Sequence, residues 1–251
     1  MDLGLKGKKA LVTGSTKGIG RAIAEVLLDE GASVAICARN ADEVTAAVAE
    51  MSKKGKVVGA SVDVGNAEAL RAWVASSAEQ LGGIDIYVHN TSAMPARKLD
   101  GWINNFNVDL MALVHGTEAA TAHLAAANGT LISIGTISNV EHFATGSGSY
   151  SALKAAMTNW TLGQAQVLGA QGIRCNVVSP GPIFFENGAW DMIKTHMAPF
   201  FEATLKTHPG GQMGDPHDVA NAVAFLASNK AKHINGANVT VDGGFLKRVD
   251  Y

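Results

Sequence analysis

The sequence contains little that points to export, to a membrane or to a disulfide framework. Only two of its 251 residues are cysteines. Cys37 and Cys175 both lie in apolar, strand-like segments, where we expect reduced core residues. No apolar run approaches the roughly 18 residues that a membrane span needs. A strand-like run begins soon after the N-terminus and leaves no room for a signal peptide. We therefore expect a cytoplasmic protein.

Charge is scarce as well. Charged residues make up 17% of the chain, the formal net charge is −2, and the basic residues form no block. Because neutralising phosphates requires clustered Lys and Arg, nucleic acid is not an expected partner. The eight histidines lack the H-x₃-H and H-E-x-x-H spacings of metal sites. The nucleophile elbow of a hydrolase directly follows a strand, whereas the stretch "GSGSY" (146–150) does not. We therefore expect no metal and no hydrolase of that kind.

What the sequence does contain is an alternation of short β-branched runs with longer alanine-rich stretches. Such alternation predicts right-handed βαβ crossovers and a buried parallel sheet. We predict an α/β fold, a single doubly wound Rossmann-type domain over residues 1–251 with about seven strands. The strand-like runs are 9–13, 33–38, 56–62, 85–90, 129–135, 173–179 and 237–241. Helical segments lie near 19–30, 41–53, 66–81, 101–126, 149–170 and 216–227. The irregular segment 182–213 follows the sixth strand, where it can cover a ligand at the carboxyl ends of the strands.

A glycine-rich loop directly follows the first strand. In "TGSTKGIG" the glycines let the backbone approach a pyrophosphate, which the N-terminus of the next helix attracts. A tight turn would need glycines too, but the strand before the loop and the helix after it favour nucleotide binding. The candidate contacts are Gly14, Ser15, Thr16, Lys17, Gly18, Ile19 and Gly20.

The end of the second strand indicates which nucleotide binds. An acidic residue about 20 residues after the glycines would bind the 2′-hydroxyl of NAD, whereas an arginine accommodates a 2′-phosphate. Here Ala38 takes the acidic position and Arg39 follows it, with Lys17 as a second cation. One interpretation is that Arg39 and Lys17 are ordinary surface charges. As cofactor ligands, they predict NADP(H), with NAD(H) as the alternative cofactor.

A tyrosine and a lysine stand four residues apart in the alanine-rich stretch "YSALKAA". On a helix, Tyr150 and Lys154 share one face, and the cation favours the phenolate. The spacing alone also fits two residues at the rim of an amphipathic helix.

Taken together, these motifs resemble the short-chain dehydrogenase/reductase family over nearly the whole chain. "TGSTKGIG" is similar to the family's T-G-x-x-x-G-x-G loop, and Tyr150 with Lys154 to its Tyr-x-x-x-Lys signature. "HNTS" (89–92) stands where the family has N-N-A-G, and only its asparagine matches. "RCNVVSPG" and "VDGG" are similar to the strand end R-x-N-x-x-x-P-G and to the C-terminal marker. The resemblance adds cofactor contacts at Asp63, Val64, Asn90, Tyr150, Lys154, Pro180, Gly181 and Ile183.

The resemblance also implies catalytic roles. Tyr150 is the general acid for carbonyl reduction, or the base for alcohol oxidation. Lys154 lowers the tyrosine pKa and holds the nicotinamide ribose. The serine that polarises the substrate oxygen usually lies 13 residues before the tyrosine, where this chain has Ile137. Of the two neighbouring hydroxyls, Ser138 is favoured over Thr136 because serine is the family's residue.

Two further positions depart from the family pattern. Asp109 replaces an asparagine whose backbone carbonyl, in relatives, holds a water that links the lysine to solvent. Because an aspartate keeps that carbonyl, we expect a tolerated change that acts mainly on pH dependence. Phe185 stands where many members have a threonine that touches the nicotinamide carboxamide.

The segment 182–213 is rich in aromatic residues and methionines, which favours an apolar substrate. A ketoacyl thioester, a cyclic or steroid-like ketone and an aromatic carbonyl all fit, with contacts from Ser138, Phe185 and Trp190. Packing within a helical lid is the alternative role of these side chains. They are Phe184, Phe185, Trp190, Met192, Met197, Phe200 and Phe201.

Two other functions and the oligomeric state complete these expectations. An NAD-dependent alcohol dehydrogenase acting oxidatively is one alternative. A non-catalytic NADPH-binding regulator is another, which the presence of both Tyr150 and Lys154 disfavours. By resemblance we expect a homotetramer or dimer that pairs the helices at 101–126 and 149–170, with Met157 and Trp160 on the apolar face of the second.

Overall fold

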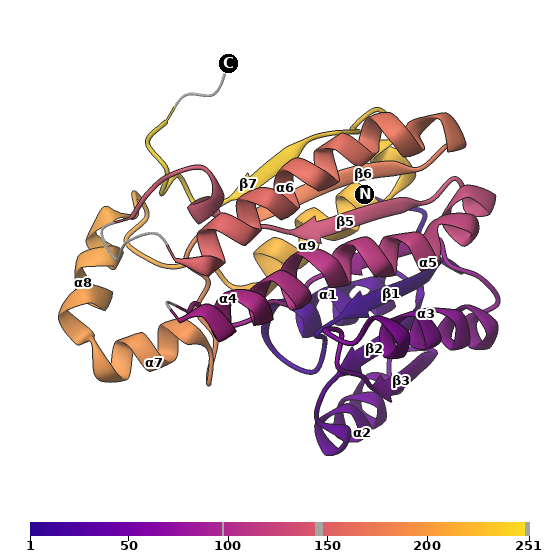
Figure 1. The fold of residues 1–251 in the computed structure, drawn as a ribbon, viewed down its shortest axis with the longest axis horizontal. Coiled ribbons are helices and arrows are strands. Elements are labelled where there is room, and N and C mark those ends of the chain that lie inside the picture. Colours follow the sequence, from indigo (N-terminus) through magenta and orange to yellow (C-terminus); the bar gives the residue numbers. More distant parts are fainter. Residues whose placement is uncertain (97, 144–147, 249–251) are drawn as a thin grey trace.

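The computed structural model describes residues 1–96, 98–143 and 148–248, and its centre is one parallel sheet (Figure 1). The strand order is β3-β2-β1-β4-β5-β6-β7, and every pair is parallel. The predicted doubly wound α/β fold is confirmed. The seven strands are β1 Lys9–Thr13, β2 Ser33–Ala38, β3 Val57–Ser61, β4 Ile86–His89, β5 Thr130–Ile134, β6 Arg174–Pro180 and β7 Asn238–Val241.

Helices cover both faces of the sheet, and each face has its own apolar core. Helices α1, α2 and α9 bury side chains such as Leu27, Met51 and Val223 on one face. Helices α3, α5 and α6 bury others, among them Trp73 and Leu113, on the opposite face (Figure 1). Their bounds are α1 Gly18–Asp29, α2 Ala41–Met51, α3 Ala67–Leu81, α5 Ala112–Ala127, α6 Ser149–Leu168 and α9 Pro216–Ala227. Both cysteines are buried and unpaired, as expected.

One predicted helix is divided in the structure. The segment 101–126 comprises the end of α4 (Leu99–Asn105), a π-helical turn over Phe106–Met111, and α5. A π-helical turn inside a helix is rare and is often found at a functional site, because it turns selected side chains out of the regular register. Here the turn carries Asp109, which is fully buried beside α6.

The segment 182–213 forms a separate excursion that carries α7 (Ala189–His196) and α8 (Ala198–Thr207), seen in orange beside the sheet in Figure 1. Its two ends are held together, because the Phe184 N–H donates to Gly214 O (2.9 Å) and the Gly214 N–H to Pro182 O (3.0 Å). No residue of α7 is buried. The segment is therefore fixed at its base and open to solvent along α7.

The strand order indicates where a ligand binds on the sheet. Strand β1 pairs with β2 on one side and with β4 on the other, so the chain reverses its winding direction at β1. In open α/β sheets, ligands bind outside the carboxyl ends of the strands at such a switch point. Among the described residues, no helix is long and apolar enough to cross a membrane.

Candidate active site

The glycine loop between β1 and α1 is shaped by two left-handed residues and one close approach. Gly14 and Gly18 have φ angles of 64° and 57°, which favour glycine over any other residue. A Cβ atom at Gly20 would collide with the carbonyl oxygen of Gly14 and with the side-chain amide of Asn90. The loop therefore brings its backbone and the N-terminus of α1 to the crevice without side chains in the way.

Asn90 joins this loop to the end of β4. Its Nδ2 atom donates to the carbonyl oxygens of Thr13 (3.0 Å) and Gly14 (2.9 Å). In return, Thr13 Oγ1 accepts the backbone N–H groups of Asn90 (3.0 Å) and Thr91 (3.1 Å). These four hydrogen bonds fix the glycine loop to the end of β4.

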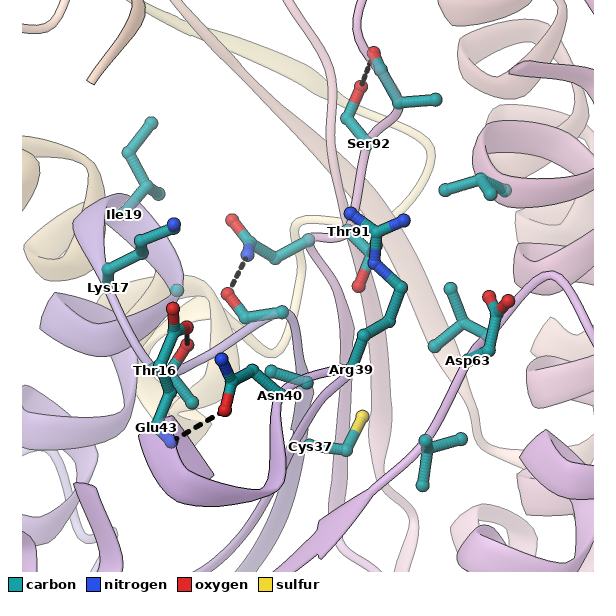
Figure 2. A pocket seen from close by; sticks show the side chains of 18 of the residues that line it. Thr16, Lys17, Ile19, Cys37, Arg39, Asn40, Glu43, Asp63, Thr91 and Ser92 are labelled. Carbon is teal, nitrogen blue, oxygen red and sulfur yellow. Dashed lines mark hydrogen bonds between the residues drawn. The ribbon is translucent and has the colours of Figure 1, made fainter. Parts of the chain in front are cut away.

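A cleft of about 630 Å³ opens in front of the loop (Figure 2). Of the residues predicted to bind the cofactor, it is lined by Gly14, Thr16, Lys17, Ile19, Gly20, Arg39, Asp63, Val64 and Asn90. Ser15 is fully buried beneath it, with its hydroxyl bonded to Val12 O (2.7 Å). The predicted contacts outside the lining are Gly18, Tyr150, Lys154, Pro180, Gly181 and Ile183. Sequence reasoning missed lining residues that include Cys37, Asn40, Glu43, Ser92, Asn104 and Val108.

One end of the cleft is suited to a phosphate. Arg39 and Lys17 are exposed there, and within the described part of the chain neither has a salt bridge (Figure 2). Asn40 caps α2, accepting the N–H groups of Asp42 (2.9 Å) and Glu43 (3.1 Å). Glu43 also lines the cleft and carries the opposite charge, and its carboxylate accepts the Thr16 hydroxyl (3.2 Å). Lys17 is the N-cap of α1, and Arg39 precedes the N-cap of α2. Two cations at the starts of two helices fit an anionic group at this position.

The other chemical centre lies on the first turns of α6. Lys154 is only 2% exposed, and its Nζ atom lies 6.0 Å from the ring centre of Tyr150. Nζ donates to the backbone carbonyl of Ile134 (2.8 Å) at the end of β5. Helix α6 thus presents a phenol and an ammonium together, as the i, i+4 spacing predicts.

The electrostatic balance around Tyr150 differs from the simple expectation of a lysine acting alone. Burial raises the pKa of the Tyr150 phenol; a hydrogen bond with Thr136 lowers it, and the charge of Asp109 raises it. Burial also lowers the pKa of Lys154, while Asp109 raises it through its charge and a hydrogen bond. Asp109 therefore favours the protonated form of both groups.

The two candidate hydroxyls after β5 have different environments. Thr136 is buried and accepts the Ser138 N–H at its Oγ1 (3.3 Å). It also lowers the pKa of the Tyr150 phenol. Ser138 is half-buried inside the short 3₁₀ turn Ile137–Asn139. The sequence favours Ser138, whereas Thr136 is the hydroxyl that lowers the pKa of Tyr150.

Asp109 is surrounded by hydrogen-bond donors. Its Oδ1 accepts the Ser92 hydroxyl (2.5 Å). Its Oδ2 accepts the Ala93 N–H (3.2 Å) and the Asn105 side-chain amide (2.9 Å). Lys154 Nζ lies farther away, 3.5 Å from Oδ1. Neither Ser92 nor Asn105 was predicted, although Ser92 belongs to the motif "HNTS".

A buried histidine lies near Asp109 and Lys154. His89, the last residue of β4, is fully buried, and neither ring nitrogen has a hydrogen-bond partner among the described residues. Burial and then the Lys154 charge lower the pKa of His89 to about 4, against an opposite effect of Asp109. His89 is therefore neutral near pH 7 and adds no charge to the site.

The lid segment packs partly on itself. Trp190 stacks on Phe200 with ring centres 5.9 Å apart, and Phe184 meets Phe201 edge-on at 6.1 Å. Phe185 instead faces the glycine loop: a Cβ atom at Gly18 would lie 2.6 Å from its ring. Phe185 lines the cleft and Trp190 does not, so of these two predicted substrate contacts only Phe185 is at the cleft.

Comparison with known proteins agrees with this geometry. Residues 14–246 match the family described as enoyl-(acyl carrier protein) reductase. The chain is 35% identical over 247 residues to isoepoxydon dehydrogenase of Aspergillus clavatus, covering 96% of this chain and 95% of that protein. It is 34% identical over 249 residues to the 3-oxoacyl-[acyl-carrier-protein] reductase of Vibrio harveyi, covering 96% and 98%. The crystal structure of L-sorbose reductase from Gluconobacter frateurii with NADPH and L-sorbose superimposes with a TM-score of 0.91 at 28% identity, covering 99% of this chain and all of that one.

Proposed function

Because the chain belongs to the short-chain dehydrogenase/reductase family of NAD(P)-dependent oxidoreductases, we propose that it interconverts a carbonyl and a secondary alcohol with NADP(H). The substrate we propose is hydrophobic: a 3-ketoacyl compound, a cyclic or steroid-like ketone, or an aromatic carbonyl. The observation that carries the proposal is the placement of the Tyr150 and Lys154 pair on α6 of a fold whose switch-point cleft has a glycine loop.

The choice of NADP(H) over NAD(H) rests on the phosphate-binding end of the cleft. Arg39 precedes the N-cap of α2, Lys17 is the N-cap of α1, and both are exposed at the cleft. Ala38 leaves the position of an NAD-binding carboxylate without charge. The L-sorbose reductase structure contains NADPH, which agrees with this choice.

The protein's own residues supply the proton chemistry. When bound, the nicotinamide donates or accepts a hydride at the substrate carbon. In reduction, Tyr150 donates its phenolic proton to the substrate oxygen, and the buried Lys154 ammonium stabilises the phenolate that remains. We assign polarisation of the substrate oxygen to Thr136 rather than Ser138, because Thr136 is buried and lowers the pKa of Tyr150.

A hydrophobic substrate is supported by two apolar side chains at the cleft. Phe185 and Met94, from the segments after β6 and β4, line it. They offer apolar surface to a substrate rather than charged groups.

Self-association is the remaining part of the proposal. Apolar side chains of α4 and of the π-helical turn are exposed at helical spacing, which favours a homotetramer or dimer through this surface. They are Leu99, Trp102, Ile103 and Phe106. Met157, expected on the paired face of α6, is fully buried within its own chain and belongs to the core instead.

The experiment that tests the function is a substrate panel. Hydrophobic ketones, a ketoacyl thioester and a ketose are offered with NADPH and separately with NADH, and the absorbance of the reduced nicotinamide is followed. We expect turnover of apolar ketones with NADPH. Turnover of the ketose alone would contradict the substrate class, and absence of turnover across the whole panel and its alcohols would contradict the proposed activity.

A further inference from the structure

Two opposite charges are buried side by side in the site and form a long ion pair. Asp109 is fully buried and Lys154 is 2% exposed. In a water-poor interior, such charges attract strongly and are expected to approach to about 2.8 Å, the length of a charge-assisted hydrogen bond. Their nearest atoms are nevertheless 3.5 Å apart, while Lys154 Nζ donates to Ile134 O at 2.8 Å.

The carboxylate is held by other donors. The Ser92 hydroxyl bonds Oδ1, the same oxygen that faces Lys154, at 2.5 Å. The Ala93 N–H and the Asn105 amide bond Oδ2. A hydroxyl bonded to a carboxylate is a strong, charge-assisted interaction, so Ser92 competes directly with Lys154 for Oδ1.

The sequence offers an independent sign that these residues act together. Ser92 stands at the last position of "HNTS", where the family motif has a glycine, and Asp109 stands where the family has an asparagine. The two departures lie 17 positions apart and bond each other in the structure. A glycine at position 92 would supply no hydroxyl to the carboxylate.

We propose that Ser92 is a positioning residue: its hydroxyl keeps the ion pair between Asp109 and Lys154 long and leaves the Lys154 ammonium available to Tyr150 and to the cofactor ribose. The inference rests on the proposed function, since it gives Lys154 its role there. Without the hydroxyl, Oδ1 takes Lys154 as its donor and withdraws the ammonium from both partners.

Few other titratable groups bear on this arrangement. Asp109 raises the pKa of Tyr150 and of Lys154 on α6, and of His89 on β4. His89 is neutral near pH 7, so the charges that decide the geometry there are those of Asp109 and Lys154. The Ser92 hydroxyl carries no charge, which lets it hold the carboxylate without altering the net charge of the site.

The test is a double-mutant cycle. Ser92→Ala is compared with Ser92→Thr, which keeps the hydroxyl, and with Asp109→Asn and the double variant Ser92→Ala/Asp109→Asn. We expect Ser92→Ala to lower turnover and NADPH affinity by about tenfold or more, the usual scale of a hydrogen bond to a charged group. Ser92→Thr should stay within about threefold of the parent, as the retained donor requires. The double variant should return to within about threefold of Asp109→Asn, because the amide no longer captures Lys154.

Two outcomes would overturn the inference. One is Ser92→Ala within about twofold of the parent in both turnover and NADPH affinity. The other is a loss in Ser92→Ala that Asp109→Asn fails to relieve, which indicates a role for Ser92 unrelated to the carboxylate. NADPH affinity is measured directly, and thermal unfolding checks that each variant is folded. Tyr150→Phe in the same assay separates this question from the proposed function: activity retained in that variant counts against the proposed function and not against the role of Ser92.

Discussion

The Nζ atom of Lys154 lies 6.0 Å from the ring centre of Tyr150, one turn along α6, and the buried Asp109 carboxylate lies 3.5 Å from the same Nζ. Lysine and aspartate act on the phenol in opposite directions. The ammonium favours the phenolate, whereas the carboxylate raises the tyrosine pKa. The proton chemistry of the site is therefore set by three groups and not by the tyrosine and lysine alone.

Replacing Asp109 by asparagine should reveal this balance in the pH profile. Carbonyl reduction needs a protonated Tyr150, so activity falls as pH rises through the tyrosine pKa. Because Asp109 raises that pKa, Asp109→Asn should lower it and move the basic limb of the pH–rate profile to lower pH. Turnover at the optimum should stay within about tenfold of the parent. A hundredfold loss, with fold and NADPH binding intact, would show instead that the carboxylate itself relays protons.

Cofactor choice should follow the charges after β2. The parent should bind NADPH more tightly than NADH. Ala38→Asp with Arg39→Ala should reverse this preference, because it places a carboxylate on the ribose diol and removes a phosphate partner. Dissociation constants of both cofactors for parent and variant are the measurement, with Ala38→Asn as an uncharged control at the same position. A parent that prefers NADH would refute the role given to Arg39 and Lys17.

Substitution should distinguish the roles of the two hydroxyls after β5. Thr136→Ala should lower turnover by about a hundredfold, the scale of losing one donor to the substrate oxygen. Ser138→Ala, its matched control two residues on, should stay within about threefold. Steady-state rates with one ketone of the panel decide the matter. The reverse result would return the role to Ser138, as the family spacing predicts.

Local sequence patterns predict some features of the site and not others. The strands and the glycine loop follow from periodicity and from glycines at positive φ, which are properties of a few neighbouring residues. The sequence therefore predicts all seven strands and most of the cleft lining near the loop. It also places Tyr150 and Lys154 on one face of α6.

Contacts between distant segments could not be predicted in this way. The π-helical turn that buries Asp109, and its bond with Ser92 from the end of β4, depend on how three elements meet. The assignment of Ser138 assumes a fixed number of residues between β5 and α6. Thr136, which lies 14 residues before the tyrosine, lowers the tyrosine pKa, and that effect does not follow from the spacing of the motif.

The most direct test of the whole account is Tyr150→Phe, which removes one hydroxyl and keeps the ring that packs beside Lys154. Turnover of the best ketone with NADPH should fall by about 10²–10⁴-fold, the usual contribution of a general acid. NADPH affinity and the unfolding temperature should stay close to those of the parent. Turnover within about threefold of the parent would contradict the assignment of Tyr150 as the proton donor, and with it the proposed mechanism.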